Sequence, residues 1–234
     1  GFDAPLGARL IALQDFFAHG VVQAIVPVAQ QDWVRLTQSQ FEPVCIQPDF
    51  WVVPSWHEVP EAARHVIRLD PGMAFGTGTH PTTRMCLRWI SAHPPRAQRV
   101  LDYGCGSGIL AIEAALHGAS TTDAVDIDPV AVQATAANAT ANGVALHAGA
   151  PDSAHGKYDL IVANILASPL TTLAPVLCGH LAHDGWLLLA GLLREQAQAL
   201  QQVYRPWLAL DIADQEEAWV LLAGHHLSPT QSAP

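Results

Sequence analysis

The feature that most constrains the fold of this chain is an apolar strand that runs into a glycine-rich turn and then into a helix. It spans Val100 to Leu110, with the sequence VLDYGCGSGIL. The glycines at 104, 106 and 108 lack the Cβ atoms that would hold a ligand away from the main chain. The helix that follows presents unpaired backbone N–H groups at its start. The segment predicts a place where the backbone contacts a ligand, and the competing interpretation is an ordinary turn between core elements.

The spacing of these glycines argues against a dinucleotide site. The fingerprint G-x-G-x-x-G, begun at Gly104, would require a glycine at position 109, and the residue there is Ile109. The pattern present is D-x-G-x-G-x-G from Asp102, and a second apolar strand delivers Asp126, twenty-two residues after Gly104. An acid at that separation can hold a ribose diol. The two features together predict a site for a ribose-bearing cofactor.

Strand and helix patterns alternate from residue 99 onward, which is typical of an α/β fold with a mostly parallel sheet. We expect strands at 99–102, 122–127, 144–147, 158–163 and 185–190, and helices at 109–117, 129–142, 169–181 and 194–204. Two further strands, at 207–212 and 218–223, follow without a helix between them. They predict a closing hairpin at one edge of the sheet.

Composition narrows the classes of partner. Half of the 234 residues are apolar and 14% are charged, yet no uncharged apolar run approaches the ~20 residues of a membrane span. The formal net charge is −10 and the eleven Lys and Arg residues form no cluster, which argues against a direct nucleic-acid surface. The chain does not open with the basic and apolar regions of a secretory signal. We therefore expect a cytoplasmic protein without a membrane partner.

Cysteine and histidine show no pattern of a metal site. The four cysteines (Cys45, Cys86, Cys105 and Cys178) include no C-x-x-C pair, and the twelve histidines are scattered rather than arranged as H-E-x-x-H or at helical ligand spacing. We therefore expect no metal and reduced, structural thiols. Cys105 lies within the glycine loop, but no paired histidine or basic neighbour is evident to activate it as a nucleophile.

Two more segments place polar side chains at the ends of predicted elements. Residues 69–83 (LDPGMAFGTGTHPTT) lead into a helix from about Arg84 to Ala92, and the final two threonines either cap that helix or contact a ligand. Residues 162–166 (VANIL) put Asn164 at the end of a buried strand, the edge where open α/β sheets bind ligands. Asn164 is either a turn-forming side chain or a contact to a reacting group.

Together these segments resemble the Rossmann-like class I methyltransferases, which bind S-adenosylmethionine. Within that class they resemble the PrmA family, whose members methylate protein eleven of the large ribosomal subunit. The similarity extends over most of the chain, and its most family-specific part is the loop at 69–83. The resemblance implies a seven-stranded sheet of order 3-2-1-4-5-7-6 with the last strand antiparallel.

The resemblance also implies which residues bind S-adenosylmethionine. The carried-over contacts are Thr83, Gly104, Asp126 and Asn164, and the further lining residues are Phe75, Thr77, Asp102, Gly106 and Ile127.

Family members usually begin with a small α/β domain that grips the ribosomal protein. Here only its latter part is recognisable, as a helix over 6–18 and a strand over 21–28. We therefore expect four parts: a partial substrate-recognition module at 1–30, a linker carrying short extended pieces at 31–63, the methyltransferase domain at 64–227, and a disordered tail at 228–234. The shortened module is explained either by a fragment of a longer chain or by a reduced recognition domain with a different protein substrate.

The implied reaction is attack of an amine lone pair on a sulfonium methyl, so the protein has to position and desolvate the reactants rather than supply a nucleophile. We assign Asn164 the catalytic role of orienting the neutral amine with an uncharged acceptor. The predicted function is methylation of lysine side chains, an N-terminal amine, or both, on a large-subunit ribosomal protein.

Three alternatives stay open at this point. A related methyltransferase with another protein or small-molecule acceptor would leave the ribosomal protein without added methyl mass. A non-catalytic cofactor-binding module would never release S-adenosylhomocysteine with any acceptor. An NAD-dependent oxidoreductase conflicts with the broken G-x-G-x-x-G spacing.

Overall fold

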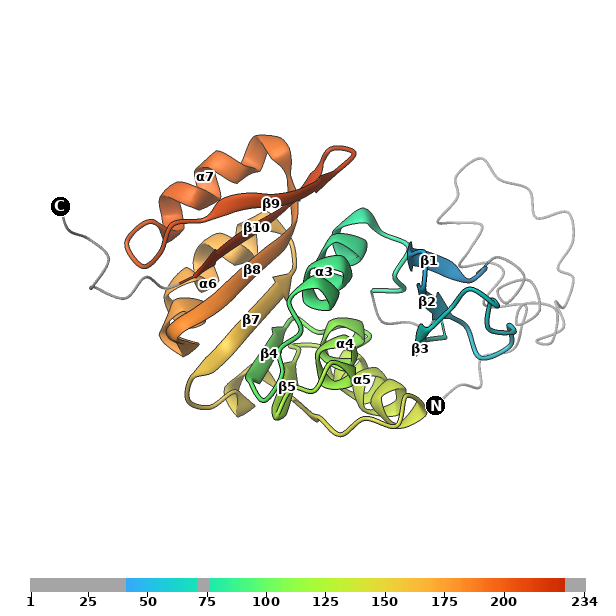
Figure 1. Cartoon of the computed structure of the whole chain (residues 1–234). Coiled ribbons are helices and arrows are strands. Elements are labelled where there is room, and N and C mark those ends of the chain that lie inside the picture. The colour runs from blue at the N-terminus through green and yellow to red at the C-terminus, as the bar shows by residue number, and fades with distance from the viewer. Residues whose placement is uncertain (1–40, 71–75, 226–234) are drawn as a thin grey trace, which may run out of the picture. The chain divides into compact units, whose positions relative to one another are not determined.

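The computed structural model describes residues 41–70 and 76–225, which belong to one compact unit that begins at Phe41. They form a three-stranded sheet and a seven-stranded sheet, and helices pack on both faces of the larger one (Figure 1). The predicted module at 1–30, with its helix and strand, and the tail at 228–234 lie outside the described residues.

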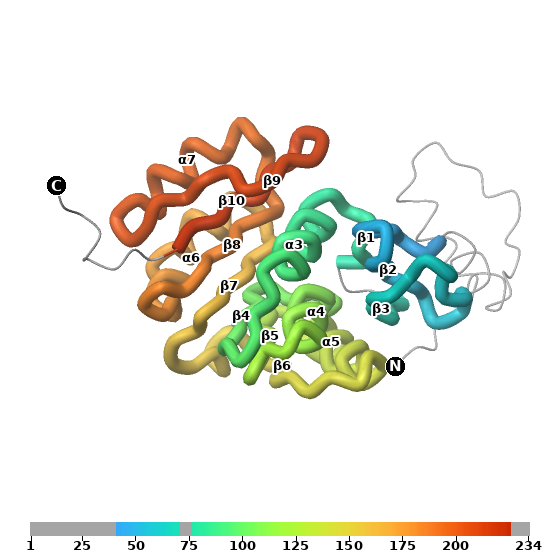
Figure 2. The backbone as a smooth tube through the Cα atoms, viewed as in Figure 1, coloured from blue at the N-terminus to red at the C-terminus, as the bar shows by residue number. Residues whose placement is uncertain are grey.

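The large sheet has the strand order that the family resemblance implies. Its strands are β4 (Arg99–Tyr103), β5 (Thr121–Val125), β6 (His147–Gly149), β7 (Tyr158–Asn164), β8 (Leu181–Leu193), β9 (Asp211–Glu216) and β10 (Trp219–His225). Across the sheet they run β6-β5-β4-β7-β8-β10-β9, which confirms the order 3-2-1-4-5-7-6 (Figure 2). The strands from β6 to β8 pair in parallel, whereas β10 is antiparallel to both of its neighbours.

Helices cover the two faces of this sheet in separate sets. One set is α3 (Pro81–Ala92), α4 (Ile109–Leu116) and α5 (Pro129–Ala141); the other is α6 (Ala167–His180) and α7 (Arg194–Tyr204); a short 3₁₀ turn occupies Pro151–Ser153. Successive strand residues point to opposite faces, so Val100 lies in the core beneath α3 and α4 while Leu101 lies in the core beneath α6 and α7. Burial on both faces explains why the parallel strands read as continuous apolar runs.

Two strands lie further along the chain than the sequence predicts. The strand predicted at 144–147 is β6 at His147–Gly149, because the N–H of Val144 still donates to the carbonyl of Ala139 in the turn that ends α5. The strand predicted at 207–212 is β9, which starts at Asp211, because the N–H groups of Trp207 and Leu208 both donate to the carbonyl of Tyr204. In both cases the backbone is still hydrogen-bonded to the end of the preceding helix where the sequence predicts a strand.

The small sheet joins two strands of the predicted linker at 31–63 to a third strand just beyond it. It consists of β1 (Val44–Gln47), β2 (Phe50–Val53) and β3 (His65–Arg68), with β1 antiparallel and β3 parallel to β2. Ile46, Phe50 and Ile67 join the same hydrophobic core as α3 and α4. The short extended pieces thus form a packed sheet, and the domain boundary at residue 63 stays a prediction.

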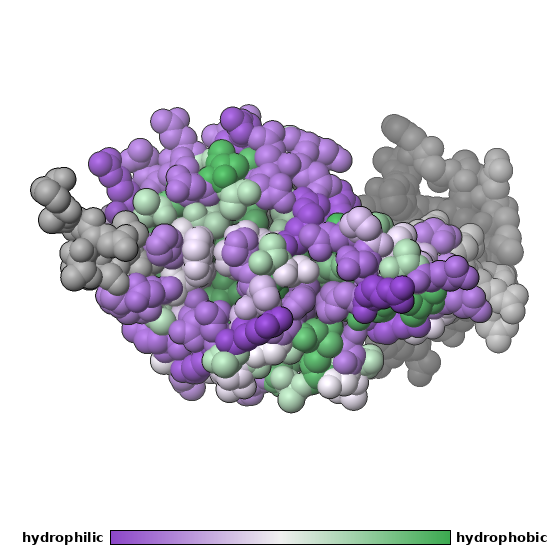
Figure 3. All heavy atoms as spheres, viewed as in Figure 1, coloured by the Kyte–Doolittle hydropathy of each residue, from purple (hydrophilic) through white to green (hydrophobic). Residues whose placement is uncertain are grey.

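The face seen in Figure 3 is largely hydrophilic, with small and separate hydrophobic areas. Within residues 41–70 and 76–225, no helix combines the length and the apolar character needed to cross a membrane.

Candidate active site

The candidate site lies where parallel strands end at one edge of the large sheet. Because β4, β5 and β7 run in parallel, the residues that follow them gather at the same edge. The chain connects β4 outward to β5 on one side, while β7 is reached by a crossover to the other side. This reversal of strand order between β4 and β7 is the position where open α/β sheets leave a ligand-binding crevice.

The glycine loop after β4 adopts a conformation that requires its glycines. Gly104, Gly106 and Gly108 have φ of +81°, +55° and +79°, the left-handed region that side chains with a Cβ rarely enter. Helix α5 braces the loop from the side: Thr135 Oγ1 donates to the carbonyl of Gly106 (3.1 Å), and Asn138 Nδ2 donates to the carbonyl of Ser107 (2.8 Å). Helix α5 thus supports the glycine loop through two side-chain hydrogen bonds to its main chain.

Ile165, directly after β7, lies between two glycines. A Cβ on Gly104 would come within 2.4 Å of the Ile165 side chain, and a Cβ on Gly191 would come within 2.2 Å of the Ile165 carbonyl oxygen. Gly191 in β8 has φ of +84°, so both space and backbone conformation demand glycine there. The two glycines therefore fix the path of the chain at Asn164 and Ile165.

Asp126 links the glycine loop to the turn after β5. One carboxylate oxygen accepts the N–H of Gly106 (2.9 Å), and the other accepts the N–H of Asp128 (2.9 Å). Asp126 is half-buried, and each oxygen keeps a second lone pair. The carboxylate is thus oriented by two backbone donors and is still able to accept hydrogen bonds from a diol.

Asp102, the last acid before the glycine loop, is buried, with 1% of its surface exposed. Its carboxylate accepts the N–H of Ala111 in the first turn of α4 (3.1 Å). Burial raises the pKa of Asp102 to about 7, against the lowering effect of that hydrogen bond, and the negative charge of Asp126 adds to the rise. A cationic group placed beside this carboxyl would favour its ionised form.

The start of α3 meets the end of β7. Asn164 Nδ2 donates to Thr83 Oγ1 (3.3 Å), which joins two predicted contacts from residues 81 positions apart. Helix α3 begins at Pro81 rather than near Arg84, and its N-cap is His80, whose ring nitrogen accepts the N–H of Thr82. Of the two interpretations of the threonines, capping does not hold, because both lie in the first turn of the helix and His80 is its N-cap.

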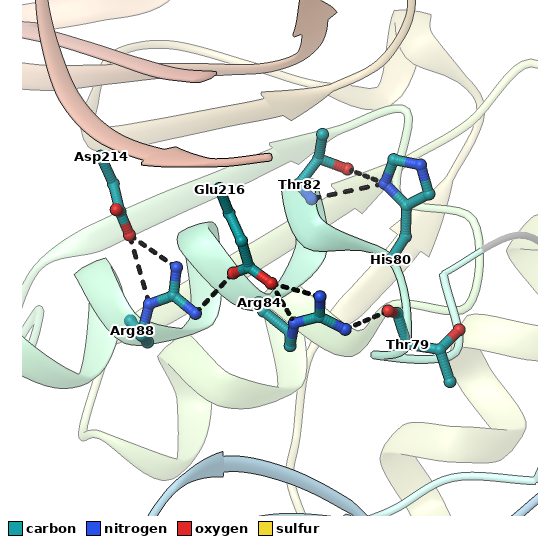
Figure 4. Close-up of polar contacts among 7 residues, drawn as sticks. All are labelled: Thr79, His80, Thr82, Arg84, Arg88, Asp214 and Glu216. Atoms are coloured by element: carbon teal, nitrogen blue, oxygen red, sulfur yellow. Dashed lines mark hydrogen bonds and ion pairs between the residues drawn. The ribbon is translucent and has the colours of Figure 1, made fainter. Parts of the chain in front are cut away.

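Arg84 and Arg88 of α3 form ion pairs with acidic residues of β9 (Figure 4). Arg88 pairs with Asp214 (2.8 Å) and with Glu216 (2.9 Å), and Arg84 pairs with Glu216. Arg84 also donates to the carbonyl of Thr79, just before the helix. These contacts fix the first turn of α3, which carries the Thr83 hydroxyl toward Asn164.

The remaining predicted residues are Ile127, Thr77 and Phe75, and the glycine loop also contains Cys105. Ile127, next to Asp126, is 89% exposed, which suits a residue that an adenine ring could cover. Thr77 Oγ1 contacts the hydroxyl of Thr79 (2.9 Å) in the loop before α3, and Phe75 lies outside the described residues. Cys105 is buried; burial raises the pKa of its thiol to about 12, which argues against a thiolate nucleophile.

The arrangement suits a cofactor with a cationic amino-acid end and a ribose. Gly104 and Gly106 lack a Cβ and adopt positive φ, Asp126 presents oriented acceptors, and Asp102 supplies a carboxyl whose ionisation a cation would favour. Asn164 adds an uncharged amide at the same edge. The residues present therefore fit S-adenosylmethionine.

A seven-stranded sheet of order 3-2-1-4-5-7-6, with a glycine loop after its first strand and an acid after its second, defines the class I methyltransferase fold. Comparison with known proteins identifies the family within that class. The family model for ribosomal protein L11 methyltransferase (PrmA) matches residues 8–226, and the chain belongs to this family.

Individual relatives agree with the family match. The chain is 60% identical over 219 residues to a ribosomal protein L11 methyltransferase of a Polaromonas species, covering 92% of this chain and 73% of that one. It is 51% identical over 217 residues to the corresponding protein of Thiobacillus denitrificans, with the same two coverages of 92% and 73%.

Solved structures give the same result for the fold. The ribosomal protein L11 methylase of Lactobacillus delbrueckii subsp. bulgaricus superposes with a TM-score of 0.73 at 33% identity, covering 80% of this chain and all of that one. A 16S rRNA methyltransferase of T. thermophilus, solved with AdoMet and guanosine, shares the fold at a TM-score of 0.56 and 20% identity, over 66% of this chain and 45% of that one.

The residues that hold the loops of the site in place were not among those predicted from the sequence. Gly191 packs against Ile165, which follows Asn164, and Asn138 donates to the carbonyl of Ser107 in the glycine loop. Ser107 Oγ donates to the carbonyl of Gly76 (2.5 Å), which connects the glycine loop to the loop before α3. Of these, Gly191 could have been identified from the sequence, since a glycine near the end of an apolar strand indicates a close approach of another backbone segment.

Proposed function

We propose that this protein is an S-adenosylmethionine-dependent N-methyltransferase that modifies amino groups of ribosomal protein L11. The names of its relatives support the substrate, and its family supports the reaction. The observation that carries the proposal is the Asn164–Thr83 contact, because it places an oriented amide at the sheet edge shared by the glycine loop and Asp126.

S-adenosylmethionine would supply the electrophilic methyl group. We assign the main chain of Gly104 and Gly106 to its amino-acid end, Asp102 to the charge of its ammonium group, and Asp126 to its ribose hydroxyls. Thr83, Thr77, Phe75 and Ile127 would complete the lining. Support for this assignment comes from the glycine conformations and from the two backbone N–H groups that aim the Asp126 carboxylate.

Asn164 would orient the acceptor amine. Its amide N–H is engaged by Thr83 Oγ1, so the amide plane is fixed and the carbonyl oxygen can accept an N–H from a neutral amine. A neutral acceptor stabilises an ammonium less than a carboxylate does, which keeps the nucleophilic form of the amine accessible. Half-burial of Asn164 at the strand end also limits water around the reacting nitrogen.

The acceptor class can be tested with ribosomal protein L11 in two forms. One sample keeps its amines free, and in the other the lysine and N-terminal amines are blocked by acetylation. We expect release of S-adenosylhomocysteine, with a matching gain of methyl mass, only from the free form. Equal release from both forms would contradict amine methylation, and release without added mass on L11 would point to a different acceptor.

The proposed substrate also accounts for the charge of the chain. A net charge of −10 favours encounter with a basic partner, a property that ribosomal proteins commonly have. Methylation of a ribosomal protein would place the reaction in the cytoplasm, where ribosomes are assembled.

A further inference from the structure

Away from the candidate active site, the structure brings together two histidines and a glutamate. Glu113 lies on α4, His117 is the C-cap of that helix four residues later, and His65 lies on β3 of the small sheet. Their ligand atoms all lie within 4.8 Å of one another. The proposed methyl transfer uses none of these residues.

The contacts within this cluster leave polar atoms without satisfactory partners. His65 Nε2 lies 2.7 Å from Glu113 Oε2 in a hydrogen bond. His117 Nε2 lies 2.9 Å from Glu113 Oε1, but neither atom forms a hydrogen bond of acceptable geometry with any residue of the described ranges, although both are buried. A buried polar atom without a hydrogen-bond partner costs free energy, and a bound ligand or ion would offset that cost.

The burial of Glu113 adds to this cost. Its side chain is fully buried, with 0% of its surface exposed, whereas the side chains of His65 and His117 are 27% and 23% exposed. A carboxylate taken fully out of water has to be compensated by a cation or by complete hydrogen bonding. The hydrogen bond with Glu113 raises the pKa of His65, so His65 compensates one carboxylate oxygen, but the oxygen that faces His117 has no hydrogen bond among the described residues.

We propose that His65, Glu113 and His117 bind a divalent transition-metal ion, with zinc as the representative ion. Two imidazole nitrogens and one carboxylate oxygen form a ligand set that zinc accepts, at bond lengths of about 2.0–2.2 Å. Tetrahedral coordination at those lengths separates the ligand atoms by about 3.3 Å. The separations of 2.7 Å and 2.9 Å join the two histidines to different oxygens of Glu113 and would widen on binding, whereas any separation near the 4.8 Å limit of the cluster would shorten. The partial exposure of both histidines leaves a fourth position for water.

The site has a structural consequence for the fold. Helix α4 begins directly after Gly108 of the glycine loop, whereas β3 belongs to the small sheet. A bound ion would join these two parts through side chains 48 positions apart in the sequence. The histidine spacing alone predicts no metal, because the helical pair here is Glu113 and His117, four residues apart, and the third member comes from a distant strand.

Zinc binding to the full-length, metal-stripped protein tests the proposal. The variants are His65→Gln and His117→Gln, and the matched control is His155→Gln, which changes an exposed histidine outside the cluster. We expect wild type and control to bind one more equivalent of zinc than either cluster variant does, as measured by titration against a chromogenic chelator. We also expect zinc to raise the melting temperature of wild type and control, but not of the variants.

Cobalt gives an independent readout, because its visible absorption reports low-coordinate nitrogen and oxygen ligands. The intense bands expected with wild type should be lost in both cluster variants, while circular dichroism shows that the variants remain folded. The proposal would be overturned by equal zinc stoichiometry and affinity in wild type and both variants. It would equally be overturned by the absence of zinc uptake by wild type, which would leave the cluster as a His65–Glu113 hydrogen bond with His117 beside it.

Discussion

Asn164 and Thr83 meet through a 3.3 Å hydrogen bond between the side-chain amide and the hydroxyl, although they lie at the ends of different elements. Asn164 ends β7, and Thr83 occupies the first turn of α3. The contact orients the amide that we assign to the acceptor amine. Its loss is therefore expected to affect catalysis more than cofactor binding.

Replacing Thr83 by valine keeps the shape of this buried side chain and removes its hydroxyl. We predict a fall in kcat of roughly tenfold to a hundredfold for Thr83→Val, because a misoriented acceptor loses much of the advantage of positioning. Thr83→Ser, which retains the hydroxyl, should stay close to wild type. Steady-state kinetics with L11 tests this, and equal kcat for the valine and serine variants would show that the hydroxyl has no positioning role.

Removing the amide itself should have a larger effect. For Asn164→Ala we predict loss of most methyl transfer, with the dissociation constant for S-adenosylmethionine changed by only a few-fold. Calorimetry gives the dissociation constant, and single-turnover kinetics gives the rate of transfer. An alanine variant that methylates at the wild-type rate would remove Asn164 from the mechanism.

Gly191 is predicted to be intolerant of any side chain. Gly191→Ala would drive a Cβ to within 2.2 Å of the Ile165 carbonyl in a backbone at φ +84°, so we expect a loss of roughly 1–3 kcal/mol in the free energy of unfolding and a lower kcat. The matched control is Gly179→Ala in α6, where a Cβ meets nothing within 4 Å and alanine favours the helix. Urea unfolding of the two variants measures the difference, and equal stability would contradict the close packing.

Asp102 should make stability depend on pH in a defined direction. Its pKa is raised to about 7 in the folded protein by burial, so between about pH 4 and pH 7 the folded state binds more protons than the unfolded state. Its contribution to stability is therefore present at the acidic end of this range and is lost as the pH rises. Asp126, Cys86 and Cys105 are the titratable groups that interact with it electrostatically.

The measurement compares wild type with Asp102→Asn by urea unfolding at about pH 5 and pH 8. The asparagine keeps an acceptor for the N–H of Ala111 but does not titrate. We expect the stability of wild type relative to the variant to fall over this interval. An unchanged difference would mean that Asp102 ionises in the folded protein as it does in the unfolded chain.

We expect the ion pairs of Arg84 and Arg88 both to stabilise the β9–β10 hairpin and to hold Thr83 in position. Because Arg84 and Glu216 are each about three-quarters buried, a double-mutant cycle with Arg84→Gln and Glu216→Gln should give a coupling free energy of about 1 kcal/mol. Both single variants should also lower kcat slightly, through the first turn of α3. Additive effects on stability would show that the ion pair contributes nothing beyond its separate side chains.

The alternating strand and helix patterns were sufficient to predict the elements of the large sheet, and the resemblance supplied its order. The sequence predicts strands that include residues 144–146 and 207–210, because both segments carry apolar residues. Periodicity alone does not distinguish a short strand from an apolar segment that follows a helix. The start of α3 was placed too late because histidine is an uncommon N-cap, although Pro81 at the first helical position is a recognised start signal.

Most of the candidate site could be proposed from motifs, whereas its supporting contacts could not. Gly104, Asp126 and Asn164 follow directly from strand ends that face one edge of the sheet. The packing of Ile165 between Gly104 and Gly191 depends on which strands are neighbours, and so does the Arg88–Asp214 pair, whose members lie 126 positions apart. Such contacts become visible only when the strand order is known.

The central claim is that Asp126 holds the cofactor for methyl transfer to L11, and intact-mass spectrometry tests it most directly. L11 is incubated with S-adenosylmethionine and wild type, Asp126→Asn, or Asp128→Asn, the last being a matched control because asparagine can replace the aspartate that caps α5. We predict mass gains in whole methyl steps with wild type and Asp128→Asn, and little or no gain with Asp126→Asn. Equal methylation by Asp126→Asn and wild type would contradict the assigned site, and no gain with wild type that binds the cofactor would contradict L11 as the acceptor.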